Sequence, residues 1–395
     1  MAIFLKRDTK VYLEKALTTG SVIWEIPVLD GFSFSQGNTT SEVTLNEMAD
    51  GSGNSKRGRR AFNDALAPAD WSMSTYIRPF ASAGTGTGAA DDTAGVHHAI
   101  EEALWANFVG TGTPTESTPG VYDFDQANIT SDAADSTISF EGSNKAELGI
   151  FNLYFVMGAT AAASADYTAS ATLEIYKLTN CVVNEATVNF EVDGIAMTEW
   201  SGNASTLTTV ATLDATGAIK EGIADTDNFI RNKLTALAMV ANAGVTRTAF
   251  PGASTDGVYN IIITGGSITF SNNITFLTPE TLGIVNIPIG HVTGNKAISG
   301  NFTAYVDSGT AGDSGSLFDA ATSTAARSII TNSFALTFKV GGSAGVPRFE
   351  ISLPTAHIEI PTIQTDDVIA VDIAFSGLPS TITSNDEATL TYVGA

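Results

Sequence analysis

The sequence contains a single cysteine, Cys181. One cysteine allows no disulfide within the chain and no metal site built from cysteine ligands. The sequence also has no run of about 18 apolar residues, the length that a membrane-spanning helix requires. Residues 1–15 lack the long apolar core of a signal peptide. We therefore expect neither secretion nor membrane binding by this chain.

Charge is also scarce, and basic charge most of all. Only 15% of the 395 residues are charged, and 19 Lys and Arg stand against 42 Asp and Glu, which gives a formal net charge of -23. Broad binding to nucleic acid depends on Lys and Arg, so this composition argues against it. It remains compatible with a surface past which DNA slides, because like charges repel. A low charge content beside 43% hydrophobic residues favours burial of the surface in an assembly.

What the chain has in quantity is β-forming sequence broken by glycine. Residues 22–36 and 258–273 are rich in β-branched and aromatic side chains. Each segment is interrupted by a turn-forming pair, Asp30-Gly31 in the first and Gly265-Gly266 in the second. These patterns predict two hairpins of the same shape in two distant parts of the chain.

The two segments belong to a longer series of matches, which indicates an internal duplication. Strand-like segments with similar landmarks follow one another in the same order in each half. The matched landmarks are Phe34 with Phe270, Tyr76 with Tyr305, and Trp200 with Phe375. Each match is weak alone, and their common order carries the prediction.

Each half also contains one segment with helical periodicity. Residues 95–108 place apolar side chains on one stripe, and residues 314–326 occupy the corresponding place in the second half. Each half therefore reads as several strands, one helix and more strands. This pattern predicts a mainly β, α+β chain, or β-sandwiches with a helix packed against each.

The length of each half suggests where the domains lie. We predict a first domain at 1–205 and a second at 229–395, joined by a linker at 206–228. The first half is longer because of two polar, glycine-rich insertions, at 81–95 and 109–144. Such segments are expected on the surface.

Four segments have the residue types of catalytic or ligand sites, but none has the required context. GDSGS (312–316) lacks the His and Asp of a serine protease triad, and we expect Asp313 or Ser314 to cap a helix. HHAIEE (97–102) fits solvated helix-face pairs. GTGTG (84–88) fits a flexible loop, and Asp366-Asp367 fits a turn. We expect no enzyme, no metal site and no cofactor.

Together these landmarks resemble the major tail tube proteins of siphophages, the phages with long, non-contractile tails. The closest resemblance is to the branch in which two tube domains are fused in one chain. The residues that carry it are at 60–79, 198–203, 263–290 and 356–368.

The resemblance implies two tandem β-sandwich tube domains, each flanked by a helix, which contribute strands to an inter-subunit β-barrel. Three such chains would form a pseudo-hexameric ring, and stacked rings would form the tube through which the genome is ejected. Its expected partners are further copies of the chain, the tape measure protein, and the tail tip and tail terminator proteins. DNA would pass without specific binding. The expected location is the virion, after synthesis in the host cytoplasm.

A tube of this kind needs a lining, and strand 187–194 offers candidates for it. Val188, Phe190 and Val192 alternate along this strand with polar residues. The alternating polar residues are Asn189, Glu191 and Asp193. We predict that they face the lumen, where an acidic lining would repel the DNA backbone. The alternative is an ordinary solvent-facing position.

A dense basic cluster before residue 61 is unusual on so acidic a chain. In tail tube proteins the corresponding loop reaches the neighbouring ring, so we predict that this cluster and nearby apolar residues make inter-ring contacts. The predicted contact residues are Lys56, Arg57, Arg59, Arg60, Phe62 and Leu66. The counterpart in the second half, 276–297, is largely apolar. DNA binding and a solvated loop are the competing interpretations of the cluster.

A second function remains open at this point. Thr/Ser/Gly-rich strands with little charge are also compatible with a β-sandwich adhesin or binding module. The absence of a recognisable signal peptide in residues 1–15 counts against that alternative.

Overall fold

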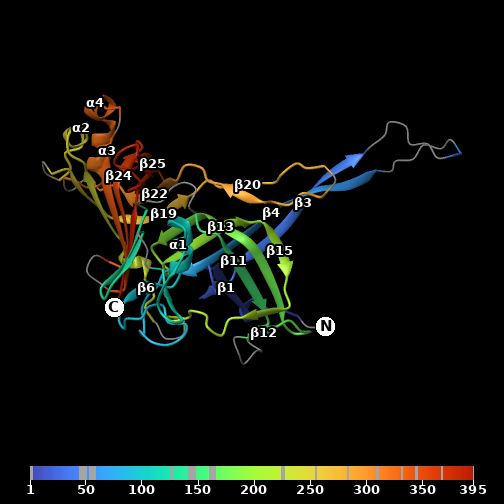
Figure 1. Ribbon diagram of the computed structural model, residues 1–395. Helices are drawn as coiled ribbons and strands as arrows, with labels where there is room; N and C mark the ends of the chain where they lie inside the picture. Colours follow the sequence, from blue (N-terminus) through green and yellow to red (C-terminus); the bar gives the residue numbers. More distant parts are fainter. Residues whose placement is uncertain are drawn as a thin grey trace.

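The computed structural model describes residues 3–43, 51–52, 59–124, 128–140, 148–159, 166–223, 227–253, 256–282, 284–307, 311–330, 332–342, 346–365 and 368–394. The fold is mainly β, with 52% strand and 10% helix, as the sequence predicts. Figure 1 shows a body of antiparallel strands from which a long arm, formed by β3 and β4, extends to one side. No helix in the described part of the chain is long and apolar enough to cross a membrane.

The strands of the two halves follow the same order along the chain. Those of the first half are β1 (Thr9–Ala16), β2 (Ser21–Ile26), β3 (Ser33–Val43), β4 (Arg60–Tyr76), β11 (Phe151–Met157), β13 (Glu174–Glu191), β14 (Met197–Ala204) and β15 (Thr206–Thr209). Those of the second half are β17 (Ala236–Ala241), β18 (Val258–Ile261), β19 (Ile263–Ser271), β22 (Ala297–Tyr305), β23 (Phe334–Val340), β24 (Arg348–Ile358), β26 (Ile369–Gly377) and β27 (Thr389–Val393).

Shorter elements connect these strands. The short strands are β5 (Pro79–Ala81), β6 (His97–Ala99), β7 (Thr115–Thr118), β8 (Val121–Asp123), β9 (Ile129–Ser131), β10 (Asp135–Ser139), β12 (Asp166–Thr168), β16 (Thr212–Asp214), β20 (Thr275–Leu277), β21 (Gly290–Val292) and β25 (Thr362–Thr365). The helices are α1 (Glu102–Val109), α2 (Val245–Ala249), α3 (Ser314–Thr322) and α4 (Thr324–Arg327), with short 3₁₀ turns at Lys6–Asp8 and Asn232–Leu234.

Strand pairing is the same in both halves, element for element. The first half pairs in the order β2–β1–β11–β13–β14–β4–β3. The second pairs in the order β18–β17–β23–β24–β26–β22–β19. In each half one long strand pairs with one neighbour along its first part and with another along its second part. β13 pairs with β11 and then with β14, and β24 pairs with β23 and then with β26. Each of these strands therefore joins the two layers of its half.

The segment 206–228 contains the last of these matched strands. β15 pairs with the first part of β13, as β27 pairs with the first part of β24. β16 pairs with β12, which also belongs to the first half. The strands of the first half therefore continue to Asp214.

The register corrects one of the landmark matches. Trp200 and Phe375 take equivalent places, because Gly202 pairs with Trp71 and Gly377 pairs with Ile298. Tyr76, however, pairs with Met197, three residues before Trp200, whereas Tyr305 pairs with Ala370, five residues before Phe375. Tyr76 and Tyr305 are thus two positions out of register, although the short motifs around them look alike.

The two predicted hairpins are wrong, although their strands are present. β2 pairs with β1, and β3 pairs with β4, so Asp30-Gly31 connects strands that are not neighbours. Gly265 and Gly266 lie inside β19 instead of in a turn. Gly266 is needed there because a Cβ would lie 2.4 Å from the carbonyl oxygen of Asn301. A close approach of two strands, not a reversal of the chain, explains Gly266.

The first predicted helix begins later than expected and lies deeper. His97–Ala99 form strand β6, and the helix starts at Glu102. Every residue of α1 is buried. Trp105 packs against Trp200, with ring centroids 4.6 Å apart, and against Phe270 of the second half at 5.8 Å. α1 therefore fills the space between the halves. The second predicted helix is confirmed as α3 and α4, and α2 was not predicted.

The two insertions are parts of the packed structure and not loose surface loops. In 109–144, β10 pairs with β27 of the second half, and Phe140 is buried against Phe270. In 81–95, the carboxylate of Glu221 accepts bonds from Ser82 Oγ at 2.9 Å and from the backbone N–H groups of Ala83 and Ala90. Polar composition concealed this because several of the buried residues are small or polar, such as Ser82 and Asp91.

Candidate functional site

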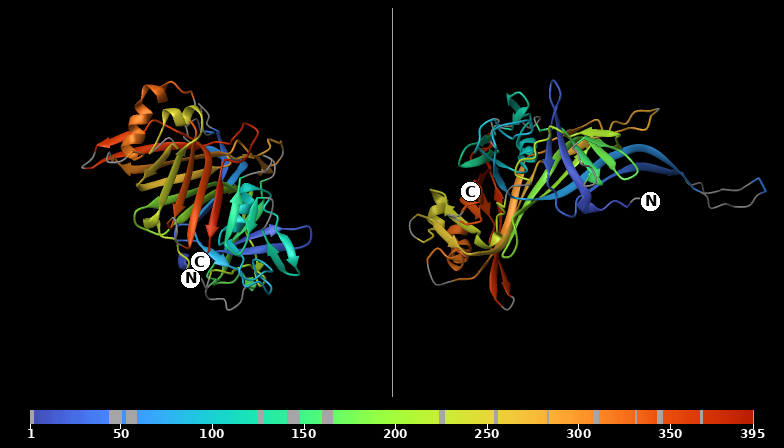
Figure 2. Two further views of the ribbon diagram at one scale, coloured as in Figure 1. Left: turned by 90° about the vertical axis from the view of Figure 1, so that its left-hand side faces the viewer. Right: turned by 90° about the horizontal axis from the view of Figure 1, so that it is seen from below.

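A continuous sheet crosses from one half to the other, and its joint is β13·β19. Seven residue pairs, from Glu185 with Ser271 to Glu191 with Gly265, form this antiparallel contact. The hydroxyls of Thr187 and Thr269 lie directly opposite each other, 3.0 Å apart. The sheet therefore runs β3–β4–β14–β13–β19–β22–β26–β24, and the second half repeats the first. Figure 2 shows the strands of the second half lying side by side.

The two faces of this sheet differ in chemistry. Residues on one face are buried in the core, among them Trp71, Trp200, Val188, Phe270 and Phe375. The register places the alternate residues on the other face. These are Ser33, Ser35, Asp70, Ser72, Ser74, Tyr76, Glu185, Thr187, Asn189, Glu191, Met197, Glu199, Ser201, Asn203, Gly265, Ser267, Thr269, Ser271, Ala297, Ser299, Asn301, Thr303, Tyr305, His357, Glu359, Ala370, Asp372, Ala374 and Ser376. We call this set the polar face; it carries six carboxylates and no Lys or Arg.

Hydrogen bonds between neighbouring strands hold the short side chains of the polar face in place. Asn203 Nδ2 donates to Asp70 Oδ1 at 2.6 Å, and the hydroxyls of Ser33 and Ser72 are 2.8 Å apart. In the second half, Asn301 accepts from Ser267 and donates to Asp372 at 3.2 Å. The polar face therefore presents hydroxyl, amide and carboxylate groups that hydrogen bonds hold in place.

The predicted lumen residues lie on or beside this face. Asn189 is half-buried on the polar face, and Glu191 is exposed at the end of β13. Asp193 lies beyond the strand, in the turn before Gly194, and is exposed. Val192 is 41% exposed and does not join Val188 and Phe190 in the core. The predicted alternation therefore holds only as far as Glu191, because the strand ends there.

The two borders of this sheet carry less pairing than its interior. In the described residues, β3 pairs with β4 alone. At the other border, the side chain of Asn332 bonds both the N–H and the C=O of Ile358 at 2.8 Å. Beyond Ile358, the chain continues to β25, which pairs with β26 alone. These borders are places where another strand can add.

The basic segment belongs to the arm, and part of it lies outside the described residues. Lys56 and Arg57 are not described. Arg59 is exposed and lies 3.2 Å from Glu42 of the facing strand, so part of its charge is balanced within the arm. Arg60 and Phe62 are exposed on β4. Leu66, the last predicted contact residue, is half-buried, and its N–H donates to Asn286 O at 2.8 Å.

The apolar counterpart in the second half lies beside the arm. Asn286 donates to Asp64 O at 3.3 Å, so the backbone of the 276–297 segment contacts β4 directly. A hollow of about 740 Å³ separates the rest of the two segments. Many large aliphatic side chains of the segment are exposed. They are Leu277, Leu282, Ile284, Val285, Ile287, Ile289 and Val292.

The HHAIEE motif lies in the interior, which corrects the prediction of solvated pairs. His98 Nδ1 is 2.9 Å from Glu102 Oε2, and both side chains are fully buried. Asp91 Oδ2 approaches the other ring nitrogen at 3.6 Å. Burial opposes the charged ring, but the two carboxylates outweigh it and raise the pKa of His98 to about 10. The motif therefore forms a buried ion cluster in the first half.

Glu101, the neighbour of this cluster, reaches the C-terminal strand. Tyr392 Oη donates to Glu101 Oε1 at 2.6 Å and accepts from Trp105 Nε1 at 2.8 Å. Burial raises the pKa of Glu101 to about 8, against the opposing effect of the Tyr392 hydrogen bond. This network links α1 to β27.

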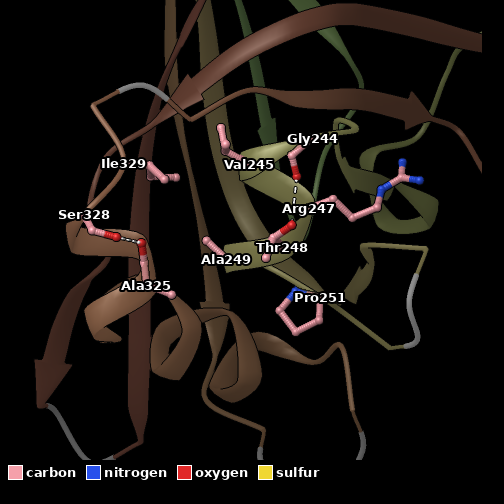
Figure 3. A pocket seen from close by; sticks show the side chains of 9 residues that line it. All are labelled: Gly244, Val245, Arg247, Thr248, Ala249, Pro251, Ala325, Ser328 and Ile329. Atoms are coloured by element: carbon pink, nitrogen blue, oxygen red, sulfur yellow. Dashed lines mark hydrogen bonds between the residues drawn. The ribbon is translucent and has the colours of Figure 1, made fainter.

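A hollow lies between α2 and α4, and Figure 3 shows its lining. Its volume is about 780 Å³, and Arg247 is the sole ionisable residue among those that line it. The guanidinium of Arg247 donates to Ala241 O at 3.1 Å and points away from the hollow (Figure 3). This hollow contains no paired acid and base.

The remaining motifs have structural places. Asp313 caps α3 by accepting from the Ser316 N–H at 2.7 Å, which confirms the predicted cap. Gly84, Gly86 and Gly88 adopt left-handed backbone conformations. A Cβ at Gly88 would lie 2.8 Å from Ala218 O, so this loop packs closely. Asp366 and Asp367 lie outside the described residues.

Comparison with known proteins adds one relative. Tail tube protein pb6 of Escherichia phage T5 is 29% identical over 404 aligned residues, which cover 99% of this chain and 76% of that protein. The resemblance to siphophage tail tube proteins is confirmed. The mainly β fold agrees with it, and so does the expected location in the virion. No protein-family model matches the chain.

Proposed function

We propose that this chain is the structural subunit of a siphophage tail tube. The similarity to a tail tube protein and the mainly β fold support the general role. The observation that carries the detail is the β13·β19 joint, where one half of the chain adds a strand to the other. We take this contact between the two halves of one chain as the model for the contact between neighbouring chains.

The chain consists of two tandem tube domains in this proposal, which the sequence places at 1–205 and 229–395, and the first domain also includes β15 and β16 of the segment 206–228. The identical pairing order of the two halves supports the duplication. Within it, β3 corresponds to β19, and β13 corresponds to β24 with β25.

Three chains form a closed ring by repeating the internal joint between chains. The β3 border of one chain adds to the β24–β25 border of the next, as β19 adds to β13. Heterologous contacts of this kind close when the rotation per subunit divides a full turn. Ring closure also removes the free sheet borders, which are otherwise prone to unspecific pairing.

The correspondence gives a residue-level register for this contact. Thr187 faces Thr269 inside the chain. Glu359 is the second-half equivalent of Thr187. Its backbone N–H donates to Ala374 O, and the residue before it, Ile358, pairs with Phe375. Ser33 takes the place of Thr269, because Phe34 and Phe270 are equivalent. We therefore expect Ser33 of one chain to face Glu359 of its neighbour.

The polar face lines the lumen, because its opposite side is already buried in the core of each domain. Glu185, Glu199 and Asp372 then give the bore a negative surface, and Asn189 and Glu191 belong to the same lining. Because the polar face itself carries six carboxylates and no Lys or Arg, this surface repels DNA phosphates. DNA therefore passes without specific binding, and the role is structural instead of catalytic.

The rings stack through the arm. The predicted contact residues Arg59, Arg60 and Phe62 are exposed there, and the long arm reaches well beyond the body in Figure 1. Stacked rings form the tube, with the tape measure protein inside it during assembly and the tail tip and terminator proteins at its ends.

Engineered disulfides test the ring. Ser33→Cys with Glu359→Cys should give disulfide-linked trimers under mild oxidation, because directly opposite residues of antiparallel strands lie about 4.5–5.5 Å apart, within disulfide range. Native Cys181 is buried and does not compete. The product is read on a non-reducing gel, and the assembled material by negative-stain microscopy.

The internal joint supplies the matched control. Thr187→Cys with Thr269→Cys should crosslink within one chain and leave a monomer of altered mobility. Linked species that continue beyond the trimer would contradict a closed ring of three. A monomer that crosslinks only at the control pair and binds glycans would instead favour the adhesin alternative.

A further inference from the structure

The strand register defines two opposite ends of the sheet. β19 runs from Ile263 to Ser271 and leads into the 272–296 connection beside the arm. Ile262 therefore lies at the end away from the arm. Because Glu191 pairs with Gly265, the turn between β13 and β14 lies at that same end. We call these the arm end and the turn end. In Figure 1 the arm reaches away from the part of the body that contains α2, α4 and β25.

The arm end presents an aromatic and a cationic side chain on one face. Arg60 and Phe62 are two residues apart on β4, so they point to the same side. Both are exposed, Phe62 to 51%. Ser41, the residue opposite Phe62 in the arm, is too short to cover a phenyl ring. A large apolar side chain beside a guanidinium is a common anchor at protein interfaces.

The turn end has a hollow of matching character. It measures about 210 Å³, and its apolar walls include Phe190, Val192 and Ile262. Ile262 is 82% and Val192 41% exposed, whereas Phe190 is buried. Charged groups of both signs surround the hollow, because Arg231 precedes the lining residue Asn232 as Asp193 follows the lining residue Val192. Glu191 and Lys233 belong to the lining itself.

We infer that the turn-end hollow receives the arm of a second copy of this chain, with Phe62 in the hollow and Arg60 against Asp193 and Glu191. The inference rests on the proposed tube, because it assigns the receptor for the stacking arm. Glu191 and Asp193 are both exposed and offer carboxylates to Arg60, and the two apolar surfaces lie at opposite ends of one sheet. They cannot meet within one chain, and a contact between opposite ends propagates without limit along a stack.

Charge reversal tests the contact. Arg60→Glu and Asp193→Arg each place like charges together, and each should raise the critical concentration for tube formation by about tenfold, which corresponds to about 1.4 kcal/mol. The double variant restores an opposite-charge pair and should polymerise close to wild type. Light scattering gives the critical concentration, and circular dichroism confirms that each variant is folded.

Phe62 has its own variant and a matched control. Phe62→Ser should impair stacking while rings still form, whereas Ile330→Ser, at a position that is also highly exposed, should leave the tube unchanged. Phe62→Cys with Ile262→Cys should crosslink successive rings, whereas a trimer-only product would overturn the contact.

The outcomes separate this inference from the proposed function. If wild type forms tubes and the single charge variants assemble equally well, the proposed receptor is wrong and the proposed tube still stands. A double variant as defective as the single variants would overturn the receptor too. Wild-type protein that forms neither rings nor tubes would contradict the proposed function itself.

Discussion

Tyr392, three residues before the end of the chain, donates its phenolic hydrogen to Glu101 at 2.6 Å, across 291 positions of sequence. The same oxygen accepts the indole N–H of Trp105. All three side chains are fully buried. The C-terminal strand is therefore fastened to the helix that fills the space between the two halves.

Removing this hydroxyl should destabilise the whole chain. Tyr392→Phe leaves a carboxyl oxygen and an indole N–H buried without their partner, and we expect a loss of about 1–3 kcal/mol in the free energy of unfolding. Urea denaturation of the unassembled protein measures it. Tyr305→Phe, at an exposed position, is the control and should change little. Equal stability of both variants would mean that the Tyr392 network contributes nothing.

Stability should fall as the pH rises through neutrality. Glu101 has a folded-state pKa of about 8, above its ordinary value of 4.5. Its contribution is complete below the unfolded pKa and is lost as the pH rises through the folded one. His98, with a pKa of about 10, has the same sign and acts at higher pH. The expected slope from one such group is at most about 1.4 kcal/mol per pH unit.

Glu101→Gln isolates this effect. The amide keeps the shape of the side chain but does not titrate, so the free energy of unfolding should depend less on pH between 5 and 8 than it does in wild type. The measurement is a series of denaturation curves across that range. An identical pH dependence in both proteins would show that Glu101 titrates normally.

Reversing charge on the polar face should affect DNA passage more than assembly. Glu185→Lys with Glu199→Lys introduces cations where the proposed lumen has none, so phosphates would bind and genome ejection would slow. Particles that contain the variant are compared by the rate of DNA release after triggering. Asp319→Lys, on the exposed side of α3, adds the same kind of charge off this face. Normal ejection from the double variant would refute an acidic bore.

A glycine inside the sheet gives a sharp packing test. A Cβ on Gly300 would lie 2.4 Å from Ser267 O and 2.6 Å from the ring of Phe375. Gly300→Ala should therefore push β22 from its neighbours and cost about 1–3 kcal/mol. Gly37→Ala is the matched control, because Gly37 also lies in a strand but has no atom within 4 Å of a Cβ. Thermal unfolding compares the two.

The sequence was a good guide to the strands and a poor guide to their neighbours. Alternation identified the second part of β13, and β-branched and aromatic content identified the region of β18 and β19. Pairing depends on contacts distant in sequence, so Asp30-Gly31 suggested a hairpin where β2 and β3 lie apart. Similar motifs around Tyr76 and Tyr305 hid a shift of two residues, which only the paired strands reveal.

Local charge patterns were the least reliable guide to the candidate site. The spacing of His98 and Glu102 fitted an exposed helix, yet both lie in the core, where each balances the other. Of the residues on the polar face, the sequence predicted only Asn189 and Glu191 as part of a functional surface. The extent of the polar face depends on the joint of β13 with β19, and nothing in either strand specifies that pairing.

The β13·β19 joint has a kinetic consequence. Because both strands belong to one polypeptide, they meet at an effective concentration set by the connecting chain and not by how much protein is present. Dilution therefore cannot open this joint, and it delays only the encounters between separate molecules. In the proposed ring, a tandem chain would halve the number of such encounters, and a missing or misplaced unit would become correspondingly rarer in the proposed tube.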